Sequence, residues 1–296
     1  MRTEVTPHTL REIFDDFEAA VVWVQAAGFP VDQGRVAEYR KVLQELARTF
    51  DACGWGDMND PLRREKVCTT LLEVRELTSI HRGLAQVREV AAVEGLRHYV
   101  KGPFQPNDES HRNASNRPRN LGFELYLNAL FAHAGLRPSY ETNADLCFTH
   151  GVVTFFAEAK RPMTASSVER LIGEANKQLN RRLKNLHSHS ARGLIALDLS
   201  KVINPYNNIM PVYGENHLHQ LMFNEDRRQI EGLREFWHRN RHPRTIGVLL
   251  HYRMLTNFLP SGALNTLKWI GFVQLREDPA LTELNDKLQA VIRMVC

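Results

Sequence analysis

Residues 152–161 have the sequence VVTFFAEAKR, and this stretch decides the fold. Its β-branched and aromatic residues predict a strand in the interior of a sheet, and Pro162 ends that strand. Side chains alternate between the two faces of a strand, so Glu158 and Lys160 point to the same side. An acid and a base therefore share one face at the end of an apolar strand.

The segments on either side of this strand predict an α/β domain. Before it, residues 144–148 form a short apolar strand, and residues 149–151 suit a hairpin turn. After it come an amphipathic helix at about 165–187 and an apolar run at 193–200, which is typical of a strand buried on both faces. A helix between two strands indicates a βαβ crossover, so we expect an α/β fold with a mixed sheet.

The chain is expected to divide into two parts joined by a linker. Residues 1–101 show helical periodicity throughout, which predicts an all-helical N-terminal region. Residues 102–119, GPFQPNDESHRNASNRPR, are rich in proline and asparagine and predict a linker or long loop. The α/β domain then occupies 120–296, and it opens with a helix at 120–135.

Composition excludes several classes of protein. The 296 residues are 43% hydrophobic and 24% charged, an ordinary balance for a globular protein. The chain shows no run of membrane-spanning length and no signal-peptide pattern, so we expect a cytoplasmic protein without a membrane partner. The four cysteines form no CxxC pair, which argues against a disulfide framework or a zinc site. Patterns for nucleotide binding or acyl transfer are also missing from the sequence.

The charge of the chain allows a polyanionic partner. The net charge is +4, and the basic residues are concentrated in 181–192 and in 237–244. Such stretches can follow a phosphate backbone, and a solvated helix end is the equally good alternative. The candidate nucleic-acid contacts in the first stretch are Arg181, Arg182, Lys184 and Arg192. The linker adds Arg112, Arg117 and Arg119 as further candidates.

Three acids converge on Lys160 if the predicted hairpin forms. Asp145 lies in the strand before Glu158, and Glu124 lies at the margin of the buried stripe on the preceding helix. Carboxylates are the ligands that Mg²⁺ and Mn²⁺ prefer, and a lysine beside them can hold a phosphate oxygen or position an attacking water. The arrangement predicts a phosphodiester-hydrolysis site, with Asp145, Glu158 and Glu124 as candidate metal ligands.

These residues resemble the PD-(D/E)XK nuclease superfamily, whose fold is that of restriction endonucleases. The resemblance covers roughly residues 118–202 and implies a restriction-endonuclease-like α-β-β-β-α-β core with Mg²⁺ or Mn²⁺ as cofactor. By this resemblance Asp145 is the motif aspartate, Glu158 and Lys160 are the ExK pair, and Glu124 is the acid of the first helix.

The next helix carries a further catalytic candidate and a departure from the family pattern. Some members of the superfamily have a glutamine four residues before a tyrosine on this helix. Gln178 stands near the place of that glutamine, but the fourth residue after it is Arg182. Among the histidines, only His150, in the expected turn near Asp145, is of interest, and a solvated turn residue is its simpler interpretation.

The resemblance implies a Mg²⁺-dependent endonuclease that acts on DNA in preference to RNA. Restriction or anti-phage defence is a setting suggested by analogy between folds. The helical region is left as a candidate surface for self-association or for a protein partner. The alternative is a non-catalytic adaptor or nucleic-acid-binding protein that keeps the nuclease fold as a scaffold. In a third interpretation, Glu158 and Lys160 are a solvated strand end with Asp145 in a turn.

Overall fold

The chain folds into two compact units. The computed structural model describes residues 9–85, 90–109, 116–139, 144–186, 188, 190–259 and 263–295. One unit comprises the described residues up to Leu130 together with Tyr206–Ile209, and the other comprises Phe131–Pro205 and the described residues from Met210 onwards. The division lies within helix α5 (Arg117–His133), downstream of the boundary expected at 102–119.

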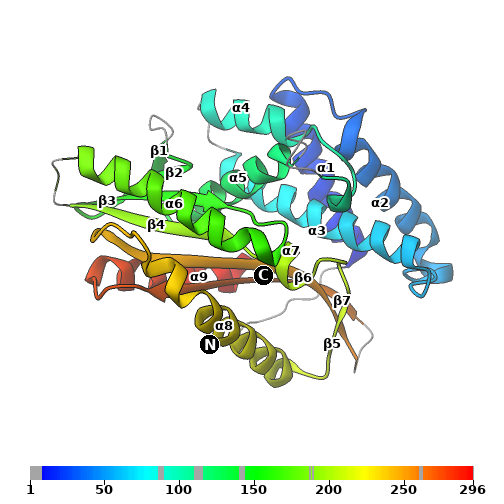
Figure 1. Ribbon diagram of the computed structural model, residues 1–296. Helices are drawn as coiled ribbons and strands as arrows, with labels where there is room; N and C mark the ends of the chain where they lie inside the picture. Colours follow the sequence, from blue (N-terminus) through cyan, green and yellow to red (C-terminus); the bar gives the residue numbers. More distant parts are fainter. Residues whose placement is uncertain are drawn as a thin grey trace. The chain divides into compact units, whose positions relative to one another are not determined.

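The first unit consists of helices, which confirms the all-helical prediction for the described part of the N-terminal region (Figure 1). Its elements are α1 (Leu10–Ala26), α2 (Gly34–Cys53), α3 (Pro61–Leu84), α4 (Val90–Tyr99), the 3-10 turn η1 (Pro106–Asp108) and most of α5. Local signals fix the helix starts. Thr9 and Glu12 form a capping box at α1, and Asp60 caps α3 ahead of Pro61.

A buried ionic network crosses the interior of the helical unit. The side chain of Arg119 is 1% exposed and forms ion pairs with Glu109 at 2.5 Å and with Glu73 at 3.2 Å. It also donates hydrogen bonds to the carbonyl of Phe104 at 2.7 Å and to the hydroxyl of Tyr39 at 3.0 Å. The interpretation of Arg119 as a linker contact for phosphate was therefore wrong, because its guanidinium is buried and forms ion pairs with buried carboxylates.

Replacing Arg119 is expected to destabilise the protein. Arg119→Met leaves Glu73 and Glu109 buried with one cation fewer, and removing one partner of a buried ion pair costs about 3–5 kcal/mol. Urea denaturation followed by circular dichroism measures the loss. Arg117→Met is the matched control, because Arg117 is exposed on the same helix two residues earlier. Equal stability of the two variants would contradict a structural role for the network.

The second unit is built on a seven-stranded mixed sheet, which confirms the α/β fold class. The strand order is β1-β2-β3-β4-β6-β5, and β7 pairs with the other side of β6. The strands are β1 (Arg137–Ser139), β2 (Leu146–His150), β3 (Val153–Lys160), β4 (Ala191–Asp198), β5 (Met210–Val212), β6 (Thr245–Phe258) and β7 (Ala263–Gln274). The short edge strands β1 and β5 were not predicted, since three residues give no readable alternation.

The predicted hairpin is confirmed. Strands β2 and β3 pair antiparallel, from Leu146 opposite Ala157 to His150 opposite Val153. The turn lies at residues 151–152, slightly later than predicted, and Gly151 has φ +59° there. A glycine with positive φ at the first central position is what a type II′ hairpin turn requires.

The predicted βαβ crossover is also confirmed. Strand β3 leads through α6 (Ala165–Asn185) into β4, which pairs parallel to β3 with Glu158 opposite Ile195. The remaining helices are α7 (Ser200–Ile203), α8 (Glu215–His238) and α9 (Pro279–Val295). No helix in the described part of the chain is long and apolar enough to cross a membrane.

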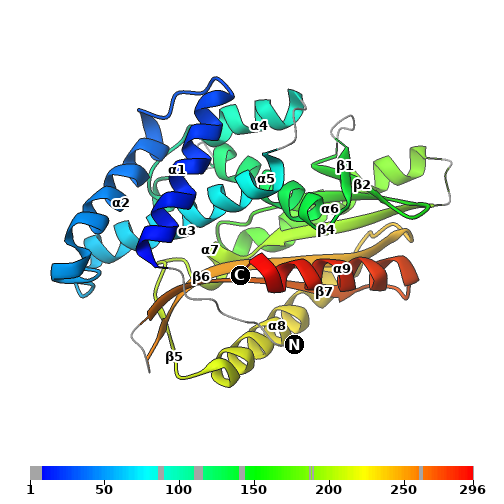
Figure 2. The ribbon, with the colours of Figure 1, turned by 180° about the vertical axis from the view of Figure 1, so that it is seen from behind.

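Helices cover both faces of the sheet. Helices α6 and α8 contribute Ile172 and Trp237 to a core that includes Ile195 of β4. On the other face lies α9, as Figure 2 shows from behind, and its Leu281 packs directly over Gly247 of β6. The two face assignments follow from strand alternation, so Glu158 lies on the α6 side of the sheet, with Phe156.

Candidate functional site

Asp145 meets the end of β3 through two hydrogen bonds. Its Oδ2 atom accepts one from the backbone amide of Ala159 at 2.8 Å and one from Nζ of Lys160 at 3.1 Å. The strand register explains the contact, because Asp145 directly precedes Leu146 and therefore follows the pairing toward Glu158. The hairpin thus brings together Asp145, Glu158 and Lys160, as the sequence predicted, and their functional roles remain predictions.

Glu158 is held inside the unit by a cation from the crossover helix. The residue is 1% exposed, and its Oε1 atom accepts a hydrogen bond from Nη2 of Arg182 at 2.9 Å. The guanidinium of Arg182 also lies over the ring of Phe156, 5.7 Å from its centroid. Sequence reasoning assigned Arg182 to phosphate, whereas in this structure it orients Glu158. The signal for this role was the position of Arg182 on the helix that directly follows β3.

The other carboxylate oxygen of Glu158 faces Lys160. The Oε2 atom is buried without a hydrogen-bond partner among the described residues, and Nζ of Lys160 lies 3.6 Å away. A buried oxygen of this kind is costly unless a cation or a donor compensates it. Oδ2 of Asp145 and Oε2 of Glu158 therefore both face one position, that of the Lys160 ammonium. This shared point suits a hard cation better than a neutral ligand.

The candidate metal ligands are two carboxylates and one backbone carbonyl. Asp145 and Glu158 supply the carboxylates, and the carbonyl of Ala159 lies 3.0 Å from the same Lys160 nitrogen. Among the described residues, no group of three or more acidic, histidine or cysteine side chains is placed to hold a metal ion. Mg²⁺ characteristically uses only one or two protein carboxylates and completes its shell with water and substrate phosphate, so this oxygen set fits it.

Glu158 is a weaker acid than an exposed glutamate. Burial raises the pKa of Glu158 to about 7, and the charge of Asp145 adds to the rise. Lys160 and Arg182 act in the opposite direction and do not cancel it. Burial and a neighbouring like charge shift carboxyl pKa values in this direction both at functional sites and within structural ion-pair networks.

The other two predicted catalytic residues lie on helices α5 and α6. Glu124 lies half-buried on the part of α5 that belongs to the helical unit, whereas Asp145 and Glu158 belong to the α/β unit. Gln178 is exposed on α6, and no hydrogen bond among those described joins it to either acid. Arg182, one turn later on the same helix, is the α6 residue that contacts Glu158.

The four candidate nucleic-acid contacts have different environments. Arg181 and Lys184 are exposed on the last turns of α6 and are available to a phosphate backbone. Arg182 is engaged by Glu158, and Arg192 forms an ion pair with Asp278 at 2.6 Å. The exposed pair is therefore the part of stretch 181–192 that still fits the prediction.

The second basic stretch, residues 237–244, serves the fold. Arg244 donates hydrogen bonds to the carbonyls of Leu183, Leu186 and Ser188, at and just after the C-terminal end of α6. Arg239 pairs with Glu169 of the same helix. The phosphate-contact hypothesis for this stretch therefore has no support from the arrangement of these two arginines.

His150 is not near Asp145. Asp145 directly precedes the first residue of β2, whereas His150 is its last residue and the turn follows at 151–152. The imidazole Nε2 lies 3.1 Å from a carboxylate oxygen of Glu283 in α9. His150 is therefore the last residue of β2 and not a turn residue, and it does not join Asp145 and Glu158.

A second polar cluster lies on the opposite face of the sheet and was missed from the sequence. Asp198 Oδ2 lies 3.4 Å from Nε of Arg161, and its Oδ1 lies 3.3 Å from Nδ1 of His251. Burial acts to raise the pKa of Asp198, but the hydrogen bond and charge of His251, with Arg161, hold it below its ordinary value. Oδ1 of Asp198 also accepts a hydrogen bond from the backbone amide of Ser200 at 3.1 Å, so the cluster fixes the start of α7.

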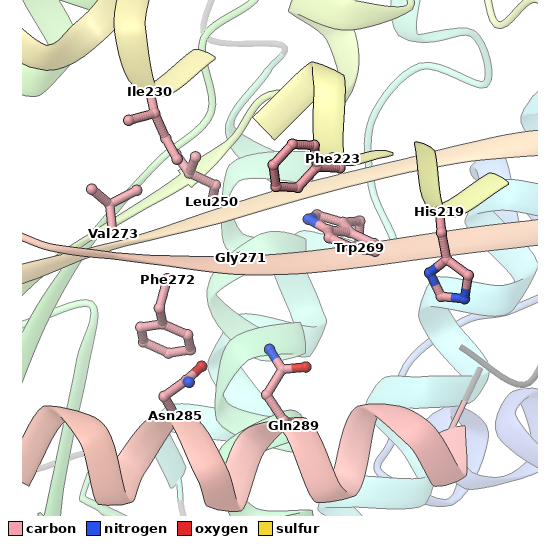
Figure 3. Close-up of a pocket in the computed structure, with 10 residues that line it drawn as sticks. All are labelled: His219, Phe223, Ile230, Leu250, Trp269, Gly271, Phe272, Val273, Asn285 and Gln289. Carbon is pink, nitrogen blue, oxygen red and sulfur yellow. The ribbon is translucent and has the colours of Figure 1, made fainter. Parts of the chain in front are cut away.

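A cavity of about 340 Å³ lies at β7, on the far side of β4 and β6 from the two acids. Figure 3 shows Phe223 and Ile230 of α8 on one side of the strands, with Asn285 and Gln289 of α9 on the other. Its lining is completed by His219, Leu250, Trp269, Gly271, Phe272 and Val273. The cavity is largely apolar, and its position separates it from the chemistry of Glu158.

Comparison of the chain with protein-family models, with curated proteins and with solved structures found no significant match. The resemblance to the PD-(D/E)XK superfamily therefore stays a prediction from the sequence.

The raised pKa of Glu158 predicts a pH-dependent stability. The folded state keeps the Glu158 proton up to about pH 7, whereas the unfolded chain releases it near 4.5. The folded state thus binds more protons between these values, and its stability falls as pH rises through them, by at most about 3 kcal/mol.

Glu158→Gln removes this contribution. Urea denaturation in EDTA at pH 5 and pH 8 should show a smaller loss for Glu158→Gln than for the wild type. The control Glu174→Gln changes a partly exposed glutamate that pairs with Arg170 and should keep the wild-type loss. Parallel profiles for all three proteins would contradict the assignment.

The ion pair with Arg182 predicts the direction of a further pKa change. Arg182 lowers the pKa of Glu158, so Arg182→Gln should raise that pKa further. Carboxyl ¹³C NMR titration, with Glu158→Gln used to assign the resonance, measures the change. Arg181→Gln removes an equal charge from the exposed neighbouring position and should leave the titration in place. A Glu158 resonance that titrates identically in Arg182→Gln and the wild type would refute the orienting contact.

Proposed function

We propose that this chain is a divalent-metal-dependent nuclease that hydrolyses phosphodiester bonds. The observation that carries the proposal is the meeting of Asp145, Glu158, the carbonyl of Ala159 and Lys160 around one point. Acids that hold a metal, placed beside a cation that holds phosphate, are the parts that this reaction needs.

Asp145, Glu158 and the carbonyl of Ala159 would hold Mg²⁺ or Mn²⁺. When bound, such an ion polarises the phosphoryl group and makes a coordinated water more acidic. Arg182 is a positioning residue, because its hydrogen bond to Oε1 leaves Oε2 of Glu158 directed toward the shared point. The hairpin supplies rigidity, since two of the three oxygen donors lie on β3.

Lys160 is the candidate for a direct role in the reaction. Its ammonium donates hydrogen bonds, so it can orient the attacking water or hold a non-bridging phosphate oxygen in place. The water oxygen forms a new bond to phosphorus while the bond from phosphorus to the leaving oxygen breaks. The water releases a proton, and the leaving oxygen gains one, so the products are a phosphate monoester end and a hydroxyl end.

DNA is the substrate that we propose, on the strength of the superfamily resemblance. Arg181 and Lys184 are the candidate backbone contacts, since both are exposed near Arg182 on α6. Contacts to phosphate position a duplex without reading its sequence. Restriction or anti-phage defence is the biological setting that the analogy suggests.

A nucleic-acid-binding scaffold without catalysis is the second candidate. The observation that favours it is the charge balance of the cluster, in which Lys160 and Arg182 already face Asp145 and Glu158. In that case the exposed basic residues would bind nucleic acid while the cluster served only to stabilise the hairpin.

Cleavage assays distinguish the two candidates. Supercoiled plasmid, linear duplex, single-stranded DNA and RNA should each be incubated with Mg²⁺, Mn²⁺ or EDTA. We expect metal-dependent cleavage of DNA by the wild type and a loss of at least about 100-fold in Glu158→Gln and Lys160→Ala, as for removal of a charge-stabilising group. Glu174→Gln, at a partly exposed position on α6, is the control and should retain activity. Unchanged cleavage by both site variants, or none by the wild type on any substrate, would exclude the nuclease.

A further inference from the structure

The ammonium of Lys160 lies among the same oxygens that the proposed metal would use. Its Nζ atom is 3.0 Å from the carbonyl oxygen of Ala159 and 3.1 Å from Oδ2 of Asp145. It is 3.6 Å from Oε2 of Glu158, the oxygen that has no hydrogen-bond partner among the described residues. Three oxygens from three residues therefore surround a single positive charge, which is only 13% exposed at its side chain.

We propose that Lys160 is a built-in competitor of the divalent cation, and that its ammonium must leave this oxygen cluster before the cation can bind. The inference rests on the proposed function, because it concerns the same site. It goes further by giving Lys160 two positions with different partners, one among the acids and one toward the substrate phosphate.

Electrostatics requires the exchange. Two cations that share the same three oxygens would lie within a few ångströms of each other. Two like unit charges 4 Å apart near a protein surface repel each other by about 4 kcal/mol. A divalent ion bonds to oxygen at about 2.1 Å, so it would also take the space that the ammonium occupies. The side chain of lysine is long and flexible, and rotation about its bonds moves the ammonium without moving β3.

The exchange links metal binding to nucleic-acid binding. A phosphate oxygen offers the displaced ammonium a new anionic partner, so bound nucleic acid lowers the cost of releasing the acids to the metal. Such a coupling is reciprocal, and the metal strengthens nucleic-acid binding by the same factor. The free protein is thereby kept in a state with low metal affinity, and the site assembles in full only on its substrate.

The test is the affinity for Mn²⁺ alone, which needs no catalysis. The free-ion electron paramagnetic resonance signal reports the fraction of Mn²⁺ that is bound. Lys160→Met keeps the length of the side chain and removes its charge, so it should bind Mn²⁺ about tenfold or more tightly than the wild type, although it cannot cleave. Lys177→Met removes an exposed lysine of α6 and should leave the affinity unchanged.

Two further measurements keep the result decisive. Lys160→Gln is the second variant, should Lys160→Met fail to fold as judged by circular dichroism, and it should show the same gain. A phosphorothioate duplex, which resists cleavage, should raise the Mn²⁺ affinity of the wild type more than that of the Lys160 variant. Equal gains would overturn the coupling.

The outcomes separate this inference from the proposed function. If the wild type binds Mn²⁺ through Asp145 and Glu158, and Lys160→Met binds it no more tightly, the competitor role is overturned while the metal site stands. If neither the wild type nor the folded Lys160 variant binds Mn²⁺ in the millimolar range, the metal site itself is wrong, and both proposals fall. Tighter binding in Lys160→Met, lost again when Glu158→Gln is added, supports both.

Discussion

The hydrogen bond from the amide of Ala159 to Asp145 is the interaction on which the candidate site depends. The amide nitrogen of Ala159 lies 2.8 Å from Oδ2 of Asp145, the residue just before β2. This bond holds Asp145 against β3, the strand that carries Glu158 and Lys160. A backbone donor is fixed by the sheet, so the carboxylate position does not rely on a flexible side chain. Without this link, the contact of Asp145 with Lys160 at 3.1 Å would depend on a long, flexible side chain.

The cluster joins two acids and two bases at different depths. Glu158 is buried, Asp145 and Lys160 are partly exposed, and Arg182 reaches Glu158 from α6. Burial of Glu158 costs stability at neutral pH, since its pKa is raised to about 7. A structural ion pair alone would not need a buried oxygen without a hydrogen-bond partner, and a cation site has a use for one.

Basic residues in the sequence were a poor guide to exposed positive charge. Arg119 is buried among carboxylates in the helical unit, and Arg244 caps the end of α6 through three carbonyls. Arg192 is paired with Asp278. An arginine has five donors, so it readily serves buried carboxylates and helix ends as well as phosphate. Only the three-dimensional partners of each arginine distinguish these uses, and Arg117, Arg181 and Lys184 are exposed candidates.

The sequence by itself determined the hairpin, the βαβ crossover and the shared face of Glu158 and Lys160. These follow from local rules, because a period of two fixes the face of each side chain and turn residues fix the pairing. Only the tertiary structure decided that Arg182 orients Glu158, that Gln178 stays exposed, and that Lys160 lies among the oxygens of the acids. Those contacts depend on how α6 crosses the sheet and on which rotamer a long side chain adopts, and neither is encoded in the spacing of residues along the chain.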